Sequence, residues 1–344
     1  MTIAGIIGFG LAGRYFHTPL LQAANIEVRA VVSRQHEGAR AVLPDAQVLE
    51  DDAALLARPD IDLIVIATPN HLHAAQAAAA LRSGKHVVVD KPLCLQVSEG
   101  AHLIDLARAQ RRMLAVFHNR RWDCDFLTIK KLVDDGRLGA LNAFHARWDR
   151  YRPMITDRWR EHAQLGNGVL YDLGTHLIDQ ALCLFGMPDW VQADVFAQRD
   201  GAIASDGFEI LLAKGAARIT LGVSTLAAEG GARYRVHGAQ GSYVKCGLDV
   251  QESQLRAGMA ASASTFGIEP PSQWGVLTHG SNGVREVVES ERGRWTLFYP
   301  QVRACLELGA SPPVSAQAGL DVIRVLRAAQ QSSETGARVQ LNPT

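Results

Sequence analysis

The first 120 residues of this chain alternate between short, largely apolar runs and segments with helical periodicity. The runs are rich in β-branched residues and lie at 3–10, 28–33, 62–70, 86–93 and 113–119. Apolar strands of this kind are typical of a parallel sheet that helices bury on both faces. Because crossovers between parallel strands are right-handed, the alternation predicts a doubly wound α/β sheet.

The pattern changes after residue 121. A helical pattern at 125–139, closed by glycine, is followed by extended segments that include 143–151, 190–199, 208–214, 217–225 and 233–247, with two further helical patterns at 168–186 and 316–333. They predict a C-terminal α/β domain with a large, mostly antiparallel sheet. We therefore expect two domains, 1–121 and 122–344, and leave open whether the last helix packs back on the first.

The composition of the chain argues against several classes of binding partner. The chain has 344 residues with 35 Lys and Arg against 35 Asp and Glu, so no net charge attracts nucleic acid or an anionic membrane. Five widely spaced cysteines without a C-x-x-C pair argue against a disulfide framework or a zinc site. We expect no signal peptide, and no apolar run approaches the roughly 20 residues of a spanning helix. These features favour a cytoplasmic protein with a small-molecule partner, without nucleic acid or membrane.

A glycine pattern joins the first apolar run to the first helical segment. The stretch is Gly8, Phe9, Gly10, Leu11, Ala12 and Gly13, the G-x-G-x-x-G arrangement of dinucleotide-binding proteins. Gly8 would make the tight turn, Gly10 would let a pyrophosphate approach the backbone, and Gly13 would let helix and strand pack closely. The free N–H groups at the start of the helix suit the phosphates. We expect these six residues to contact the cofactor, with a ligand-free glycine turn as the alternative.

The end of the second run indicates which dinucleotide to expect. Twenty residues after Gly13, where a carboxylate usually holds the ribose 2′-hydroxyl, stand Ser33 and Arg34. A guanidinium can pair a 2′-phosphate bidentately, so these residues favour NADP(H), with NAD(H) as the second choice. Glu37 argues the other way, and the alternative for Arg34 is a solvated surface arginine.

Two further runs end in polar residues that would face the same crevice, because ligands of open α/β sheets bind beyond the carboxyl ends of the strands. These residues are Thr68, Pro69, Asn70 and His73 after one run, and Asp90 and Lys91 at the end of the next. We expect the first group to border the cofactor and the second to reach its nicotinamide end. The alternative is a turn that merely starts a helix, with His73 on the surface.

One pair in the second half has the spacing of an acid/base site. Asp172 and His176 are four residues apart in a helical pattern, so their side chains lie on one face, one turn apart. The carboxylate could orient the imidazole, and a histidine with an ordinary pKa of about 6.5 exchanges protons near neutral pH. Because no third ligand of the metal-binding kind stands nearby, we expect no metal. A solvated surface pair is the alternative.

Three features together resemble a known family: "GFGLAG" near the start, "DKP" about eighty residues later, and "GNGVLYDLGTHLID" in the second half. The chain resembles the Gfo/Idh/MocA oxidoreductases nearly end to end. The segments "VFHNRRWDCDFLTIKKL" and "YDLGTHLIDQALCLFGMP" are similar to the branch that holds NADP-dependent scyllo-inositol dehydrogenases.

The resemblance implies a Rossmann domain followed by an α/β domain whose open sheet mediates assembly into a homodimer or homotetramer, with the active site between the domains. The family's catalytic residues map to Lys91, Asp172 and His176, and Lys91–Pro92 would be a cis peptide. Asn119 and Trp159 would lie beside the cofactor. Asp90 replaces the family's glutamate, which shortens one carboxylate near the cofactor.

The activity we expect is hydride transfer between NADP(H) and a secondary alcohol or ketone of a cyclic polyol or sugar, with scyllo-inositol as the single substrate named. His176 would exchange the hydroxyl proton, and Lys91 would stabilise charge on the reacting oxygen. Two alternatives remain: a dehydrogenase for another sugar or hydroxy compound, and a nucleotide-binding regulator without turnover. Retention of Lys91, Asp172 and His176 weighs against the regulator.

Overall fold

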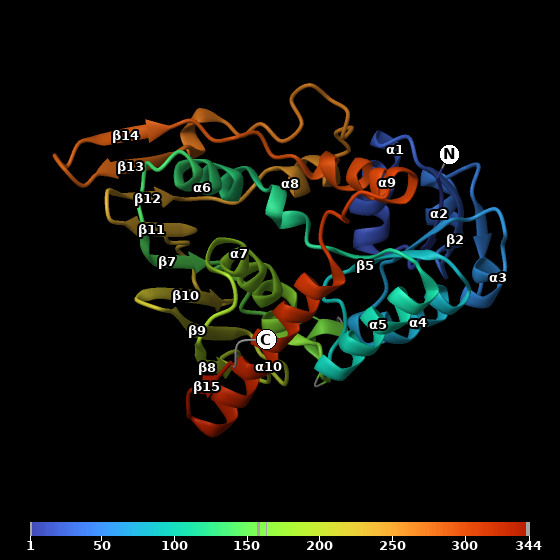
Figure 1. Cartoon of the computed structure of the whole chain (residues 1–344), viewed down its shortest axis with the longest axis horizontal. Helices are drawn as coiled ribbons and strands as arrows, with labels where there is room; N and C mark the ends of the chain where they lie inside the picture. Colours follow the sequence, from blue (N-terminus) through green and yellow to red (C-terminus); the bar gives the residue numbers. More distant parts are fainter. Residues whose placement is uncertain (1, 157–158, 163, 342–344) are drawn as a thin grey trace. The chain divides into compact units, whose positions relative to one another are not determined.

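The computed structural model describes residues 2–156, 159–162 and 164–341. Its residues divide into two compact units (Figure 1). Unit 1 comprises Met1–Asn119, Gln251–Phe266 and Arg294–Ile323, and unit 2 comprises Arg120–Val250, Gly267–Gly293 and Arg324–Thr344. The division differs from the boundary expected from the sequence, because two later segments return to unit 1. The last long helix is divided between the units at residue 323.

Unit 1 is built on a six-stranded sheet in which every neighbouring pair of strands is parallel. The order is β3-β2-β1-β4-β5-β6. The strands are β1 Ile3–Ile7, β2 Glu27–Val32, β3 Gln47–Leu49, β4 Leu63–Ile66, β5 His86–Asp90 and β6 Leu114–Phe117. All four residues of β4 are fully buried, as expected for a central strand covered on both faces. The predicted doubly wound parallel sheet is confirmed.

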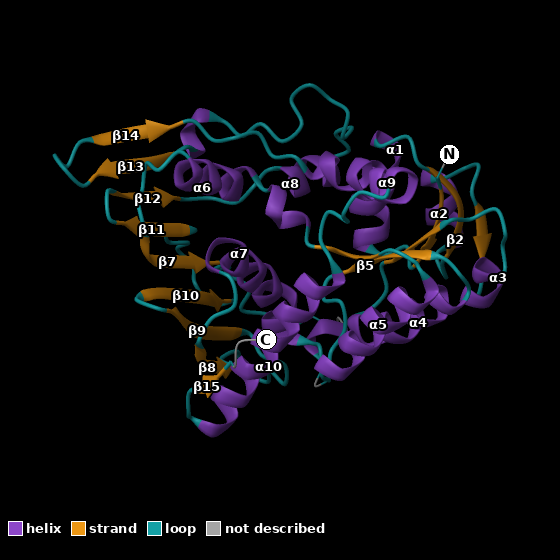
Figure 2. Ribbon diagram, viewed as in Figure 1, coloured by secondary structure: helices purple, strands orange, loops and turns teal. Residues whose placement is uncertain are grey.

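Helices cover this sheet, with α4 and α5 side by side on one face and α1 and α9 together on the other (Figure 2). The helices of unit 1 are α1 Thr18–Ala23, α2 His36–Val42, α3 Asp52–Leu56, α4 His73–Arg82, α5 Val97–Gln110, α8 Gln251–Arg256 and α9 Phe298–Leu308. Shorter helical turns are η1 Gly13–His17, η2 Asn70–Leu72 and η7 Trp295–Leu297. The strand order reverses between β1 and β4, so the loops after these two strands flank the switch point at which such sheets bind ligands.

Unit 2 contains a nine-stranded sheet in the order β14-β13-β12-β11-β7-β10-β9-β8-β15. Its strands are β7 Leu141–Arg147, β8 Trp190–Phe196, β9 Gly207–Lys214, β10 Ala217–Ser224, β11 Tyr234–Gly238, β12 Gly241–Lys245, β13 Gly275–His279, β14 Arg285–Val288 and β15 Val339–Gln340. Only the pair β7 and β10 is parallel among the pairings of the described strands. The predicted large, mostly antiparallel sheet is therefore confirmed.

The helix that carries Asp172 and His176 packs on this sheet. It begins with a wide turn, η5 Leu170–Gly174, and continues as α7 Thr175–Phe185, which contacts β7 and β10. The other helical segments are η3 Asn119–Trp122, α6 Cys124–Asp134, η4 Trp159–Glu161, η6 Pro271–Gln273 and α10 Ala316–Thr335. Within the described ranges, no helix is both long enough and apolar enough to cross a membrane.

Candidate active site

The three glycines of the first loop differ in whether a side chain would fit at their positions. Gly8 has a φ of +93°, and a Cβ there would lie 2.7 Å from the Ala67 oxygen. A Cβ on Gly13 would lie 2.3 Å from the Gly8 oxygen, so the helix could not pack this closely with any other residue. A Cβ on Gly10 would meet nothing within 4 Å. The loop is thus closed at Gly8 and Gly13 and open at Gly10, the arrangement a pyrophosphate requires.

The helix that follows offers main-chain donors. The helical segment begins at Leu11, and the Arg14 amide donates back to the Gly10 oxygen at 3.0 Å. The amides before Arg14 precede this first turn and can point at an anion. Leu11 is 44% exposed whereas Phe9 is only 4% exposed, so the Phe9 side chain belongs to the core. Any contact of Phe9 with a cofactor would come from its main chain.

The end of β2 presents Arg34 but binds Ser33 into a turn. The Ser33 amide donates to the Leu49 oxygen at 3.2 Å, and its hydroxyl accepts from the Gln35 amide at 2.9 Å. Arg34 and Glu37 are exposed. Within the described residues Arg34 has no ion-pair partner, so its guanidinium remains available to a ligand. The Ser33 hydroxyl oxygen already accepts from the Gln35 amide, and its proton can be donated to a ligand.

The loop after β4 is held from within unit 1. The Thr68 hydroxyl donates to the Gln76 side-chain oxygen at 2.5 Å, and the Gln76 amide donates to the Asp52 carboxylate at 2.8 Å. Thr68 and Pro69 are half-buried, and Asn70 is buried. The loop after β4 is therefore held in place at the switch point. Thr68 and Pro69 keep part of their surface exposed there.

The turn after β5 carries Lys91. Lys91–Pro92 is a cis peptide, and the Lys91 amide donates to the carboxylate of Asp90 at 2.8 Å. Asp90 and Lys91 are both half-buried. The aspartate thus caps the main chain of the turn, which holds the start of the lysine side chain in place.

His73 does not occupy the position expected of a cofactor ligand. It has no exposed surface, and its Nδ1 and Nε2 lie 2.7 Å from the Pro92 oxygen and 2.9 Å from the Thr68 oxygen. Burial is the main cause that lowers the pKa of His73. In this structure the His73 side chain has no exposed surface for direct cofactor contact, and both of its ring nitrogens face backbone carbonyls.

A second buried histidine lies beneath the same turn and was missed by the sequence analysis. His17, the last residue of η1, has its Nδ1 2.6 Å from the Tyr299 hydroxyl, and its ring centroid is 4.3 Å from that of Phe117. Burial lowers the pKa of His17 to about 4, while the Asp90 carboxylate acts in the opposite direction. No local motif marks His17, because its partners come from β6 and α9.

The depressed pKa of His17 predicts acid sensitivity. The unfolded chain binds a proton near pH 6.5, whereas folded His17 does so near pH 4, so the stabilising contribution is complete above pH 6.5 and is lost as the pH falls towards 4. We expect the free energy of unfolding to fall by about 2 kcal/mol between pH 7 and pH 5 from this group alone. Urea unfolding at both pH values should show a clearly smaller fall in His17→Gln. The same fall in both proteins would contradict the assignment.

In unit 2, Asp172 lies in η5 and His176 in the first turn of α7. His176 is 6% exposed, and its ring centroid is 6.0 Å from that of Trp148. Trp148 is in turn 4.4 Å from the guanidinium carbon of Arg120 and 4.6 Å from that of Arg233. The guanidinium carbon of Arg150 lies 5.2 Å from the same ring, so the candidate base lies beside an indole that contacts three cations. Neither Arg120 nor Arg233 was found by the sequence analysis, because each is brought to Trp148 from a distant element.

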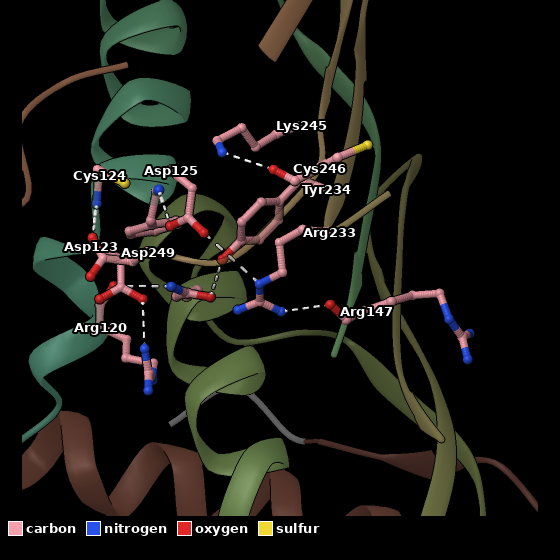
Figure 3. Close-up of polar contacts among 12 residues, drawn as sticks. Arg120, Asp123, Cys124, Asp125, Arg147, Arg233, Tyr234, Lys245, Cys246 and Asp249 are labelled. Carbon is pink, nitrogen blue, oxygen red and sulfur yellow. Dashed lines mark hydrogen bonds and ion pairs between the residues drawn. The ribbon is translucent and has the colours of Figure 1, made fainter. Parts of the chain in front are cut away.

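These arginines belong to a buried polar network (Figure 3). Arg120 donates to Asp123 at 3.2 Å, Arg233 donates to the Arg147 oxygen at 2.8 Å, and the Arg233 Nε is 4.0 Å from Asp125. Burial raises the pKa of Asp125 to about 6, and Arg233 opposes this shift. The network ties the start of α6 to β11.

A second part of this network contains Lys245 and Asp249. The fully buried Lys245 lies 3.1 Å from Glu269. The Asp249 carboxylate accepts from the Cys124 amide at 2.7 Å (Figure 3). The Asp249 contact lies at the start of α6, beside Asp123 and Asp125, which face Arg120 and Arg233.

The two remaining predicted residues lie in short helices. Asn119 follows β6 and is 5% exposed. Trp159 is half-buried, and its oxygen accepts from the Asn167 side chain at 2.5 Å. Asn167, from the "GNG" segment, also donates to the His162 oxygen at 3.1 Å, which fixes this part of the loop. Within the ranges that the structure describes, no group of three or more His, Cys, Asp or Glu could hold a metal ion.

Comparisons with known proteins agree with this architecture. Residues 3–118 match the family model "Oxidoreductase family, NAD-binding Rossmann fold", and residues 130–341 match "Oxidoreductase family, C-terminal alpha/beta domain", the two Gfo/Idh/MocA models. Among curated proteins, scyllo-inositol 2-dehydrogenase (NADP(+)) IolW of Bacillus subtilis is 38% identical over 98% of this chain and 95% of that protein. The oxidoreductase YdgJ of Escherichia coli is 40% identical over 98% of each.

Solved structures are also similar over the full length. The protein YvaA of Bacillus subtilis has a TM-score of 0.96 and 38% identity, covering 99% of this chain and 98% of its own. An oxidoreductase from Bacillus cereus has a TM-score of 0.91 and 29% identity, covering 100% of this chain and 99% of its own.

Proposed function

This chain belongs to the Gfo/Idh/MocA family of oxidoreductases, and we propose that it transfers a hydride between NADP(H) and a secondary alcohol or ketone of a cyclic polyol. The substrate pair we propose is scyllo-inositol and its keto form. The observation that carries this proposal is the retention of Lys91, Asp172 and His176 in a chain similar end to end to an NADP-dependent scyllo-inositol 2-dehydrogenase.

Each residue of this set has a chemical role in the proposed reaction. Bound nicotinamide supplies the hydride acceptor or donor at C4. The imidazole of His176 takes the proton of the reacting hydroxyl during oxidation and returns it during reduction. The ammonium of Lys91 hydrogen-bonds the reacting oxygen and stabilises negative charge that develops there. Asp172 holds either a substrate hydroxyl or the imidazole.

The preference for NADP(H) rests on Arg34. Its side chain is exposed and without an ion-pair partner in the described part of the chain, directly after β2, where the ribose 2′-position is normally recognised. A guanidinium offers paired donors to a 2′-phosphate, and no carboxylate stands at Ser33 to repel it. Together with the loop around Gly8 and Gly10, this end of the sheet suits a phosphorylated dinucleotide.

Replacement of Arg34 by alanine tests the cofactor preference. Loss of a charge-assisted contact worth about 1.5–3 kcal/mol should raise the KM for NADP+ roughly 10- to 150-fold, with little change in the KM for NAD+. The matched control is Arg40→Ala, an exposed arginine on α2. Initial rates with each cofactor give the answer. An equal effect of Arg34→Ala on the KM for both cofactors would show that Arg34 does not recognise the 2′-phosphate.

A dehydrogenase for another sugar is the second candidate. A dTDP-3,4-didehydro-2,6-dideoxy-α-D-glucose 3-reductase of Streptomyces violaceoruber is 36% identical over 46% of this chain. The side chains of the pocket rather than the fold select the substrate. A regulator without turnover is the third candidate, and the retained Lys91, Asp172 and His176 weigh against it.

A substrate panel separates the three candidates. Absorbance of the reduced nicotinamide is followed with NADP+ and NAD+ separately, using scyllo-inositol, myo-inositol, aldoses and sugar acids. The proposal predicts the highest kcat/KM for scyllo-inositol with NADP+. Faster turnover of an aldose or sugar acid would favour the second candidate. Tight NADP(H) binding without turnover on any compound would favour the regulator.

A further inference from the structure

His73 connects the loops that follow two neighbouring strands. Its Nε2 lies 2.9 Å from the Thr68 oxygen, in the loop after β4, and its Nδ1 lies 2.7 Å from the Pro92 oxygen, in the turn after β5. β4 and β5 are adjacent and parallel, with Ile66 paired to Val89. One imidazole therefore spans the two strand ends at the edge where ligands of such sheets bind.

The turn after β5 is held at two points: the Asp90 carboxylate accepts from the Lys91 amide, and the Pro92 carbonyl faces Nδ1 of His73. Proline has no N–H to donate, so its carbonyl is the main-chain group through which Pro92 can be held. The loop after β4 has independent support, because Thr68 donates to Gln76 and Gln76 donates to Asp52. Removal of the imidazole should therefore disturb the turn that carries Lys91 more than the loop that carries Thr68.

We propose that His73 is a positioning residue for Lys91. The neutral ring has one N–H, and with that proton on Nδ1 it donates to the Pro92 carbonyl while the ring packs against the fixed loop after β4, which sets the direction in which the lysine side chain leaves the turn. His73 does not itself touch cofactor or substrate, since it has no exposed surface. This inference rests on the proposed role of Lys91 in hydride transfer.

The expected effect is on turnover and not on cofactor binding. Misplacement of a positioned group by about 1 Å can lower rates roughly 100-fold, so His73→Ala should lower kcat about 10- to 100-fold. The Kd for NADPH, measured by its fluorescence, should stay within about threefold, because the loop after β4 keeps its contacts with Gln76 and Asp52. His73→Gln, which can still donate to one carbonyl, should recover part of the lost kcat.

The matched control is His71→Gln. His71 is exposed and lies two residues before His73, in η2. Its substitution should leave kcat and the Kd for NADPH unchanged. A loss of turnover in this control equal to that in His73→Ala would show that any change in this segment impairs the enzyme, and would overturn the proposal.

A double-mutant cycle with Lys91→Ala provides the decisive test. If His73 acts through Lys91, its replacement lowers kcat in the wild-type background but has almost no further effect when Lys91 is already alanine. Equal losses in both backgrounds would overturn the proposal, because His73 would then act independently of the lysine. If His73→Ala does not fold, the same cycle is measured with His73→Gln.

The cycle also separates this inference from the proposed function. Wild-type turnover in Lys91→Ala alone would refute the role of the lysine, and with it the positioning role of His73. An impaired Lys91→Ala combined with additive losses would leave the proposed function intact and refute only the positioning role.

Discussion

Replacement of His176 by alanine should lower kcat for scyllo-inositol oxidation by about 10²- to 10⁴-fold, the range that a positioned general base contributes. The imidazole is 6% exposed and packs beside Trp148, and alanine at this position removes the group that takes the hydroxyl proton in the proposed reaction. Steady-state rates of NADPH formation measure the loss. The Kd for NADPH should change little, because the glycine loop and Arg34 remain intact.

The matched control for this substitution is His279→Ala in the same unit. His279 lies in β13, where its Nε2 contacts Glu286 at 3.1 Å. It should retain the wild-type kcat. If His176→Ala also kept near wild-type turnover on an identified substrate, the assignment of the proton-transfer step would be wrong.

Lys91→Ala should lower kcat by about 10²- to 10³-fold, the effect of removing one donor aimed at a developing oxyanion. The Asp90 carboxylate accepts from the Lys91 amide and His73 faces the neighbouring Pro92 carbonyl, so the lysine side chain starts from an ordered turn. Lys91→Arg should recover little of this activity, because a planar guanidinium does not reproduce a compact ammonium at the same distance. Both rates are measured under saturating NADP+ and substrate.

Lys131→Ala is the control for loss of a lysine. Lys131 lies on α6, with a side chain that is 57% exposed and 3.1 Å from Asp135, and its replacement should leave kcat unchanged. Recovery of full activity in Lys91→Arg would mean that any positive charge suffices, which contradicts a role that depends on placement.

The sequence predicted the fold well where local patterns carry the information. The apolar residues Leu63–Ile66 within the run 62–70 form β4, and their full burial is typical of a parallel strand covered on both faces. The assignment of segments 251–266 and 294–323 to unit 1 could not be predicted. An amphipathic helix such as α9 shows which of its faces is buried, but its sequence does not say which sheet covers that face.

Some features of the candidate site could likewise be predicted from local sequence, and others could not. The glycine loop could be predicted because a positive φ at Gly8 and the close approach at Gly13 exclude other residues. His73 was found as a residue of interest, but its burial was not, since exposure depends on the packing of two loops. The stacking of Arg120 and Arg233 on Trp148 joins three segments distant in the sequence, and no local pattern announces such contacts.

The most direct test of hydride transfer follows one hydrogen of the substrate. The protein is incubated with NADP+ and scyllo-inositol deuterated on every ring carbon, and the cofactor product is analysed by mass spectrometry and NMR. We expect NADPH that carries one deuterium at C4 of the nicotinamide, together with the keto form of the inositol, and a loss of both products in His176→Ala. Reduced cofactor without deuterium, or no reduced cofactor although NADP+ binds, would contradict hydride transfer from this polyol.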